Sequence, residues 1–254
     1  MPETPSRFWD IFFEVYAALP RQGPGNRACA ARALGMCRDL PPAPRILDLG
    51  CGVGAQTRHL AELTAGTIVA VDNHGPFIER LTETVAAMGL AHRIFPVHAD
   101  MGKTGFPPAH FDLIWSEGAL YNLGLDTALR ICRDLLRPGG HLVFTDAVWR
   151  KTDVPDEVRR GFEQDSPTMG WTRDVLAIIE QSGFEVLGHF TLPDAAWWED
   201  FYTPMRARVR ELRKKYRDDA EARGILDVLW RETDLHEAHS DCYAYEFFVT
   251  RRQG

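Results

Sequence analysis

The chain has 254 residues, of which 45% are hydrophobic and 26% are charged. These proportions argue against a disordered or fibrous protein and provide enough apolar side chains for a buried core. The formal net charge is −7 at pH 7. The overall electric field therefore repels phosphate, which argues against a dedicated nucleic-acid binder and against adhesion to anionic membranes.

The cysteines and the first residues indicate the cellular setting. The 5 cysteines are odd in number, widely spaced and without a C-x-x-C pair, so the sequence predicts neither a disulfide framework nor a zinc ribbon. The opening MPETPSRFWD lacks the basic and then apolar pattern of a signal peptide, and no run of about eighteen apolar residues occurs. We therefore expect a cytoplasmic protein without a membrane span.

Short apolar runs alternate with longer helical patterns along the chain. The predicted strands are residues 45–49, 67–71, 93–98, 111–115, 141–145, 184–190 and 243–250, and the predicted helices are 54–63, 76–88, 125–136 and 172–182. A turn at residues 137–140, Arg-Pro-Gly-Gly, is expected to end the third of these helices and to start the fifth strand. This alternation predicts an α/β fold in which helices cover a mostly parallel sheet.

Three segments fall outside that alternation: residues 1–44, 148–170 and 192–241. In doubly wound sheets, ligands bind beyond the carboxyl ends of the strands, so segments that follow strands are placed to cover a pocket. We therefore predict one domain over residues 1–254, with these three segments as helical cap insertions.

A glycine-rich loop follows the first predicted strand. Residues 45–54 read RILDLGCGVG, so Asp48 and glycines 50, 52 and 54 lead into a helix. Glycine lets a ligand approach the backbone, and the helix N-terminus offers unpaired N–H groups. A dinucleotide fingerprint would place the third glycine at Ala55. The spacing instead resembles motif I of class I S-adenosylmethionine-dependent methyltransferases.

Two acidic residues follow the next strands. Asp72 ends the segment TIVAVD, where a carboxylate can accept both hydroxyl groups of a ribose; an N-cap of the following helix is the alternative. Asp100 and Met101 follow the third strand and offer an acceptor and a soft apolar face for an adenine, or form an ordinary loop. These motifs and the L-x-P-G-G turn at residues 136–140 occur in the order of the family. The resemblance implies a Rossmann-like, doubly wound sheet of seven strands, the last antiparallel, and S-adenosyl-L-methionine as cofactor.

Three further motifs resemble a bacterial subgroup of small-molecule methyltransferases: RQGPG at residues 21–25, Gln56-Thr57, and WSEGALYN at residues 115–122. With the strand ends, they give the expected cofactor-binding residues, which are Arg21, Asp48, Gly50, Gly52, Gln56, Thr57, Asp72, Asn73, Asp100, Met101 and Ser116. Arg21, with Gln22 beside it, would pair with the carboxylate of the cofactor; a solvated arginine is the alternative.

Methyl transfer from a sulfonium needs little chemistry from the protein, which mainly positions the nucleophile and excludes water. Glu117 is predicted as the base, with Tyr121 beside it, or as a residue that contributes only a hydrogen bond. The expected substrate-binding residues are Tyr16, Asn122, Asp146, Trp149 and Trp197. No metal is expected, because Glu117 and Asp146 do not make the set of oxygen ligands that a metal-assisted mechanism requires.

Other features of the third cap segment favour packing or solvation over chemistry. His236 and His239 are interpreted as a polar helix face, and the basic run at residues 206–217 as a solvated one. The aromatic cluster Trp197, Trp198, Phe201 and Tyr202 either lines a substrate or packs the cap.

The sequence therefore predicts S-adenosylmethionine-dependent methyl transfer to an oxygen or nitrogen of a small molecule. Two alternatives remain: non-methyl chemistry of the sulfonium, such as cyclisation or a lyase reaction, and a nicotinamide-dependent oxidoreductase on a related fold. We expect a small-molecule partner and neither nucleic acid nor membrane. A homodimer is compatible with this class.

Overall fold

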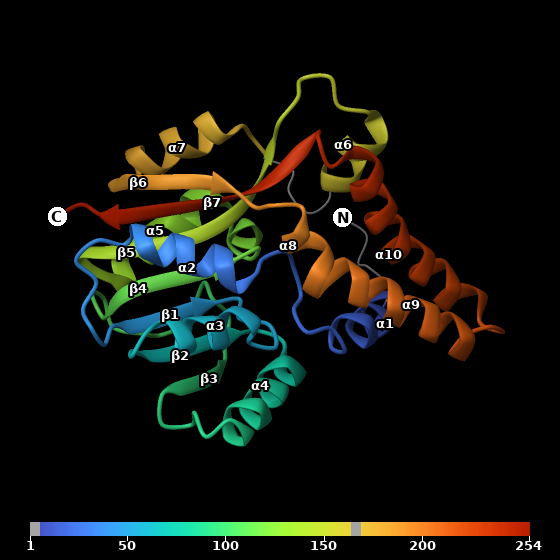
Figure 1. Cartoon of the computed structure of the whole chain (residues 1–254), viewed down its shortest axis with the longest axis horizontal. Helices are drawn as coiled ribbons and strands as arrows, with labels where there is room; N and C mark the ends of the chain where they lie inside the picture. The colour runs from blue at the N-terminus through green and yellow to red at the C-terminus, as the bar shows by residue number, and fades with distance from the viewer. Residues whose placement is uncertain (1–5, 164–168) are drawn as a thin grey trace.

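The computed structural model describes residues 6–163 and 169–254. Within these ranges a seven-stranded sheet has the order β3-β2-β1-β4-β5-β7-β6 (Figure 1). The strands are β1 Arg45–Leu49, β2 Thr67–Asp72, β3 Ile94–His98, β4 Phe111–Glu117, β5 Leu136–Trp149, β6 Phe184–Thr191 and β7 Tyr243–Arg252. Strands β1 to β5 pair in parallel, whereas β7 is antiparallel to both β5 and β6. The predicted mostly parallel sheet with an antiparallel last strand is confirmed.

Helices cover both faces of the sheet, which explains why its central strands are almost continuously apolar. The sheet helices are α2 Arg27–Met36, α3 Ala55–Leu63, α4 Gly75–Ala87, α5 Leu125–Leu135 and α7 Thr172–Gln181. On one face, α2, α3 and α4 pack against Ile46 and Leu113. On the other, α5 and α7 pack against Leu47 and Ile114. Helix α2 lies on the sheet, although the sequence analysis placed its residues in the cap.

The predicted turn at residues 137–140 is wrong. Strand β5 begins at Leu136, directly after α5, and Leu136 pairs with Phe111 of β4 before an irregularity in register. Gly139, with φ of +74°, bends the strand without ending it. At its other end, β5 extends to Trp149, which pairs with Tyr243. These extensions depend on backbone pairing with neighbouring strands, which local apolar patterns do not reveal.

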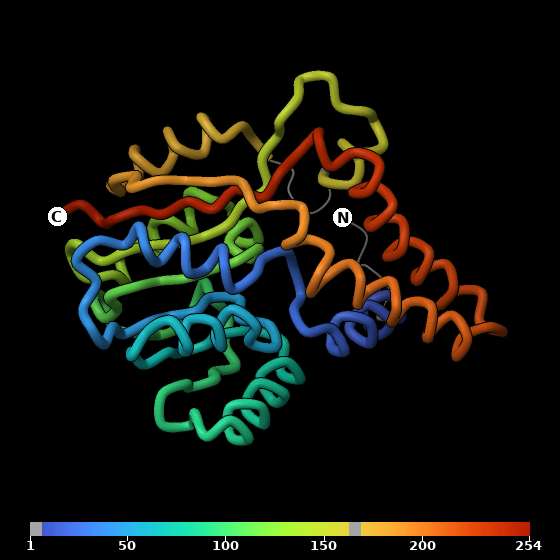
Figure 2. Tube along the Cα trace, in the orientation of Figure 1, coloured from blue at the N-terminus to red at the C-terminus, as the bar shows by residue number. Residues whose placement is uncertain are grey.

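A group of helices lies beyond the carboxyl ends of the parallel strands, and we call it the cap (Figure 1). It comprises α1 Ser6–Tyr16, α6 Asp156–Glu163, α8 Ala195–Trp197, the π-helix η2 Trp198–Tyr202, α9 Thr203–Lys215 and α10 Ala220–His239. Apolar residues of α1, α9 and α10 form a core of their own, including Ile11, Met205 and Leu226. The chain trace shows the C-terminus at the end of the sheet opposite the cap (Figure 2). Residues 1–5 and 164–168 of the predicted cap segments lie outside the described residues.

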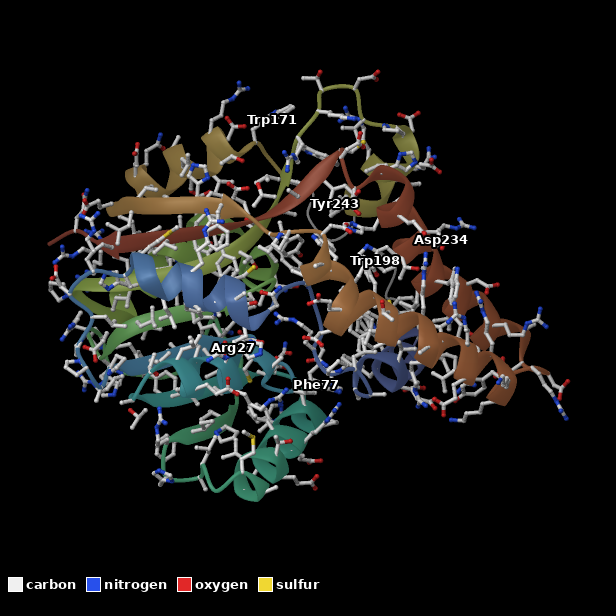
Figure 3. All side chains as sticks on the ribbon, viewed as in Figure 1. Arg27, Phe77, Trp171, Trp198, Asp234 and Tyr243 are labelled. Atoms are coloured by element: carbon white, nitrogen blue, oxygen red, sulfur yellow. The ribbon has the colours of Figure 1, made fainter. Side chains whose placement is uncertain are left out.

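The basic run at residues 206–217 is only in part the solvated face that the sequence predicted: Lys214, Lys215 and Arg217 are exposed, whereas Arg206 is half-buried. Arg206 donates to Thr233, Asp234 and Glu237 of α10, and its guanidinium carbon lies 4.8 Å from the ring centroid of Trp198. Figure 3 shows Asp234 on α10 and Trp198 on η2, the π-helix before α9. Arg206 and Arg213 therefore bind acidic residues of α10, whereas Arg208 and Lys215 pair with Glu14 of α1.

Among the helices that the structure describes, none combines the length and the apolar character required to cross a membrane.

Candidate functional site

The loop between β1 and α3 requires glycine for steric reasons. Gly50, Gly52 and Gly54 have φ angles of +71°, +55° and +82°, in the left-handed region. A Cβ at position 50 would lie 2.3 Å from the Cβ of Ala119, and one at position 52 would lie 2.5 Å from Oε1 of Gln22. The loop thus packs closely against the segments that follow β4 and α1, and it leaves no space for side chains.

Three predicted cofactor residues hold this loop from within the fold. Asp48 is fully buried, and its carboxylate accepts hydrogen bonds from Thr57 at 2.5 Å and from Gln56 at 3.3 Å. The amide of Gln56 also donates to the carbonyl of Gly50 at 3.2 Å. These bonds tie the first turn of α3 to the end of β1 and fix the path of the loop.

Asp48 gives the protein a predictable pH dependence. Burial raises the pKa of Asp48 to about 7, and the nearby charge of Glu117 adds to the effect. Because the folded-state pKa lies above the ordinary value of 3.8, the folded state binds more protons between these pH values. Stability is therefore expected to fall as the pH rises through this window. The slope contributed by one such group is at most about 1.4 kcal/mol per pH unit.

Asp48→Asn is expected to remove this slope, because an amide has no proton to lose in that range. Urea unfolding of the wild type and of Asp48→Asn at about pH 5 and about pH 7 measures how the free energy of unfolding changes with pH. Asp218→Asn, at a side chain that is 87% exposed, should keep the wild-type slope. Identical slopes in the wild type and Asp48→Asn would contradict the assignment.

Asp72 lies at the end of β2, half-buried beside the glycine loop. Its Oδ2 accepts the N–H of Gly52 at 2.9 Å, and its Oδ1 accepts the N–H of His74 at 2.9 Å. Asp72 therefore shapes both the loop and the entry to α4. The exposed Asp100 accepts the N–H of Gly102 at 2.7 Å, as an ordinary loop residue does.

The other predicted residues of this region lie nearby along the strand ends. Asn73 is exposed, and its carbonyl contacts Nε2 of His98 at 3.0 Å. Met101 is half-buried against the sheet core. The buried hydroxyl of Ser116 donates to the carbonyl of Leu49 at 2.8 Å and so joins β4 to β1. The predicted cofactor residues thus lie at or just beyond the carboxyl ends of β1, β2, β3 and β4, at one edge of the sheet.

A buried ion pair lies at the end of β4. Nη2 of Arg21 is 2.7 Å from Oε2 of Glu117, and the two side chains are 3% and 1% exposed. Arg21 also donates to the carbonyls of Gly23 and Pro24, and Nε1 of Trp115 donates to the other carboxylate oxygen of Glu117 at 2.8 Å. Within the described residues, Nη1 of Arg21 is buried without a hydrogen-bond partner. The alternative of a solvated arginine is therefore wrong.

Gln22, which the sequence analysis noted only as a neighbour of Arg21, links the glycine loop to the cap. Its Oε1 accepts the N–H of Val53 at 2.9 Å, and its Nε2 donates to the carbonyl of Tyr16 at 3.0 Å. Tyr16 is the last residue of α1, so this side chain joins the cap to the loop. Only the tertiary contact of α1 with the loop identifies this role.

The predicted catalytic and substrate-binding residues on β4 and β5 do not all share one face. Glu117 pairs with Thr145, whereas Asp146 is the next residue of β5 and faces the opposite side of the sheet. Burial raises the pKa of Asp146 to about 6. After β4, Tyr121 is half-buried in the 3₁₀-helix η1 Leu120–Leu123, and the exposed Asn122 donates from Nδ2 to the carbonyl of Ala119.

The predicted aromatic residues pack within the cap. Trp149 is half-buried, with its ring 5.7 Å from that of Phe162. Trp197 is 5% exposed and stacks on His236 at 4.3 Å. His236 itself is 2% exposed and lies 3.0 Å from the hydroxyl of Tyr243, so its interpretation as part of a polar helix face is wrong. The stacking partners of His236 come from distant segments, which the helix pattern does not show.

Residues 46–140 match a family model described as a methyltransferase domain. A sterol 24-C-methyltransferase of Gibberella zeae is 32% identical over 179 residues, which cover 65% of this chain and 46% of that protein. The chain spans about half the length of the curated relatives it matches first.

Solved structures share the fold at low sequence identity. A methyltransferase from Geobacter sulfurreducens, in complex with S-adenosyl-L-homocysteine, has a TM-score of 0.82 and 20% identity, with 100% of both chains covered. One from Thiobacillus denitrificans, in complex with the same compound, has a TM-score of 0.81 and 19% identity, over 96% of this chain and 98% of that chain. The sheet order with its antiparallel β7 defines the class I methyltransferase fold. Residues 46–140 therefore resemble a methyltransferase domain, and the chain has the class I methyltransferase fold.

Proposed function

We propose that this chain binds S-adenosyl-L-methionine and transfers its methyl group to an oxygen or nitrogen nucleophile of a small molecule. The observation that carries the proposal is the buried Nη1 of Arg21, which has no hydrogen-bond partner within the described residues. A buried donor without an acceptor costs about 1 to 3 kcal/mol, so a ligand carboxylate beside Arg21 would be stabilised. The carboxylate of the cofactor is such an acceptor.

The surrounding residues fit the rest of the cofactor. The glycine loop leads into the N-terminus of α3, and Asp72 offers a carboxylate beside the loop for the ribose hydroxyls. Asp100 and Met101 follow β3, where the adenine would lie. The bound cofactor supplies an electrophilic methyl group on a sulfonium, so the remaining task of the chain is to orient the acceptor and exclude water.

Glu117 is proposed here as a positioning residue for Arg21. Both of its carboxylate oxygens are engaged, one with Arg21 and the other with Trp115, which supports this role over that of a base. Tyr121 and Asn122 lie directly beyond the same strand and are proposed to orient the acceptor.

Asp72→Ala is expected to weaken binding of S-adenosyl-L-homocysteine by about 1 to 3 kcal/mol, the scale for loss of a charged hydrogen bond. Calorimetric titration measures this change, and a thermal melt of the variant without ligand verifies that it is folded. Asp126→Ala, at an exposed residue in the first turn of α5, serves as the control and should bind as the wild type does. Unchanged affinity in a folded Asp72→Ala would remove the ribose assignment.

Product analysis tests the reaction. Incubation with S-adenosyl-L-methionine and a panel of small hydroxyl and amine compounds should yield S-adenosyl-L-homocysteine and a product heavier by one methylene unit. Release of methylthioadenosine would instead indicate cyclisation or a lyase reaction, because these reactions cleave a different bond to the sulfur. That outcome would overturn the proposed methyl transfer while leaving the cofactor in place.

A further inference from the structure

A single side-chain amide bonds to both the glycine loop and the cap. Gln22 is half-buried in the connection between α1 and α2. Its Oε1 accepts the N–H of Val53 in the loop at 2.9 Å, and its Nε2 donates to the carbonyl of Tyr16 at 3.0 Å. An amide has its acceptor and its donors on different atoms, so an N–H group pairs with the oxygen and a carbonyl pairs with the nitrogen. Each end of the amide therefore has a distinct partner.

The oxygen end of this amide lies directly against the glycine loop. A Cβ at Gly52 would lie 2.5 Å from Oε1 of Gln22, so the two segments are in close contact. Val53 precedes Gly54, the N-cap of α3, and its N–H group is therefore not used inside that helix. Gln22 supplies the acceptor for this N–H group of the loop.

The nitrogen end of the amide binds the turn that ends α1. The carbonyl of Tyr16 accepts the N–H of Leu19 at 3.1 Å in the same turn. Earlier in the helix, the side chains of Ile11 and Val15 are fully buried in the core of the cap, and Tyr16 itself is 8% exposed. The end of α1 is therefore held by the cap core and by Gln22 together.

Other contacts hold α1 in place without the glycine loop. The ring of Phe13 stacks on that of His74 at 3.7 Å, and Arg80 of α4 donates to the carbonyls of Ala17 and Leu19. Because these contacts run to α4 and to the residue that precedes it, α1 is expected to stay docked when the residue at position 22 is changed. Such a change removes the direct bond between the loop and the end of α1.

We propose that Gln22 is a positioning residue that couples cofactor binding at the glycine loop to the docking of α1, and so to the placement of Tyr16. The proposal rests on the proposed function, because the cofactor is the ligand that would fix the loop. A helix at the surface of a fold opens locally and closes again, and a bond to an ordered loop makes this opening less frequent. Coupling is reciprocal, so the cofactor stabilises docked α1 by the same factor by which docked α1 strengthens cofactor binding. Tyr16, which the sequence predicts to bind substrate, is thereby held in place when the cofactor is bound.

Hydrogen exchange followed by mass spectrometry tests the coupling on the wild-type protein. Saturation with S-adenosyl-L-homocysteine is expected to slow amide exchange in α1 by about tenfold, together with exchange in the loop at residues 50–54. Unchanged exchange in α1 beside slowed exchange in the loop would overturn the proposal, because the ligand would then fix the loop without any effect on the cap.

Two substitutions of Gln22 separate the ends of its amide. Gln22→Glu keeps an oxygen for the N–H of Val53 but has no donor for the carbonyl of Tyr16, whereas Gln22→Leu loses both bonds. Gln22→Glu is expected to bind S-adenosyl-L-homocysteine within about threefold of the wild type, and Gln22→Leu about tenfold more weakly, because the loop N–H then has no acceptor. In both variants the slowing of exchange in α1 should fall below about twofold. Equal affinities of the two variants, or wild-type slowing in Gln22→Glu, would contradict the assignment.

Asn26→Ala is the control in the same connection. It removes the oxygen that accepts the N–H of Cys29 at 2.9 Å at the start of α2, and it leaves both bonds of Gln22 in place. This variant should melt at a lower temperature than the wild type and keep the wild-type slowing of exchange in α1. Loss of the slowing in Asn26→Ala as well would attribute the effect to general destabilisation and overturn the role of Gln22.

Titration of S-adenosyl-L-homocysteine alone distinguishes a failure of this proposal from a failure of the proposed function. A folded wild-type protein that does not bind this compound would refute the proposed function. Binding that slows exchange in the loop but not in α1 would refute only the coupling through Gln22.

Discussion

Arg21→Met is expected to lower the free energy of unfolding by about 3 to 5 kcal/mol, the scale for removing one partner of a buried ion pair. The substitution leaves the carboxylate of Glu117, whose side chain is 1% exposed, without its cation. It also removes the donors to the carbonyls of Gly23 and Pro24, which hold the segment before α2. Urea denaturation followed by circular dichroism measures the loss.

The exposed pair Arg27–Glu62 provides a matched control. Its N···O distance of 2.7 Å equals that of Arg21–Glu117, but its side chains are 55% and 48% exposed. Figure 3 shows Arg27 at the start of α2. Arg27→Met should cost less than about 1 kcal/mol, because water and salt screen such pairs. Equal losses in the two arginine variants would contradict the idea that burial makes the first pair costly to break.

Glu117→Gln distinguishes a base from a positioning residue. We expect the affinity for S-adenosyl-L-homocysteine to fall by about tenfold or more, because Arg21 loses the charge that orients it. The double variant Arg21→Met/Glu117→Gln should be more stable than the sum of the two single losses predicts. Unchanged cofactor affinity with slower turnover would instead restore the prediction of Glu117 as the base.

Gly52→Ala is expected to weaken binding of S-adenosyl-L-homocysteine by about a hundredfold, or about 3 kcal/mol. The new Cβ would lie 2.5 Å from Oε1 of Gln22 and would displace the side chain that holds the N–H of Val53. The left-handed φ of +55° adds about 1 to 2 kcal/mol of backbone strain. Calorimetric titration of the folded variant measures the affinity.

Gly89→Ala separates strain from crowding at the loop. Gly89 has a similar φ of +69°, but no atom lies within 4 Å of the position of its Cβ. This variant should lose about 1 to 2 kcal/mol of stability through strain and keep its affinity for the cofactor. A parallel loss of affinity in both glycine variants would show that general destabilisation, not the loop geometry, explains the effect at Gly52.

The sequence predicted the sheet well because its signals are local. Runs such as RILDL and TIVAVD are apolar on both faces, which is typical of parallel strands covered by helices. The glycines at positions 50 and 52 were recognisable because their spacing before a helix reflects a steric requirement that the structure now explains. The acidic residues at the strand ends were predictable because the carboxyl ends of parallel strands meet at one edge of a sheet.

The sequence did not reveal features that depend on contacts between distant segments. The burial of Arg21 requires Glu117, which lies 96 residues further along the chain. Arg206 and Arg213 were predicted to be solvated because their acidic partners lie on another helix, α10. In each case, tertiary packing decided a role that the local pattern left open.

Calorimetric titration of the purified protein with S-adenosyl-L-homocysteine, S-adenosyl-L-methionine and NAD(H) tests the central claim most directly, because every assigned role depends on which nucleotide binds the glycine loop. Our account predicts binding of the two adenosyl compounds with dissociation constants of about micromolar size and no binding of NAD(H). Binding of NAD(H) by a folded protein that binds neither adenosyl compound would contradict the assignment of S-adenosyl-L-methionine as cofactor.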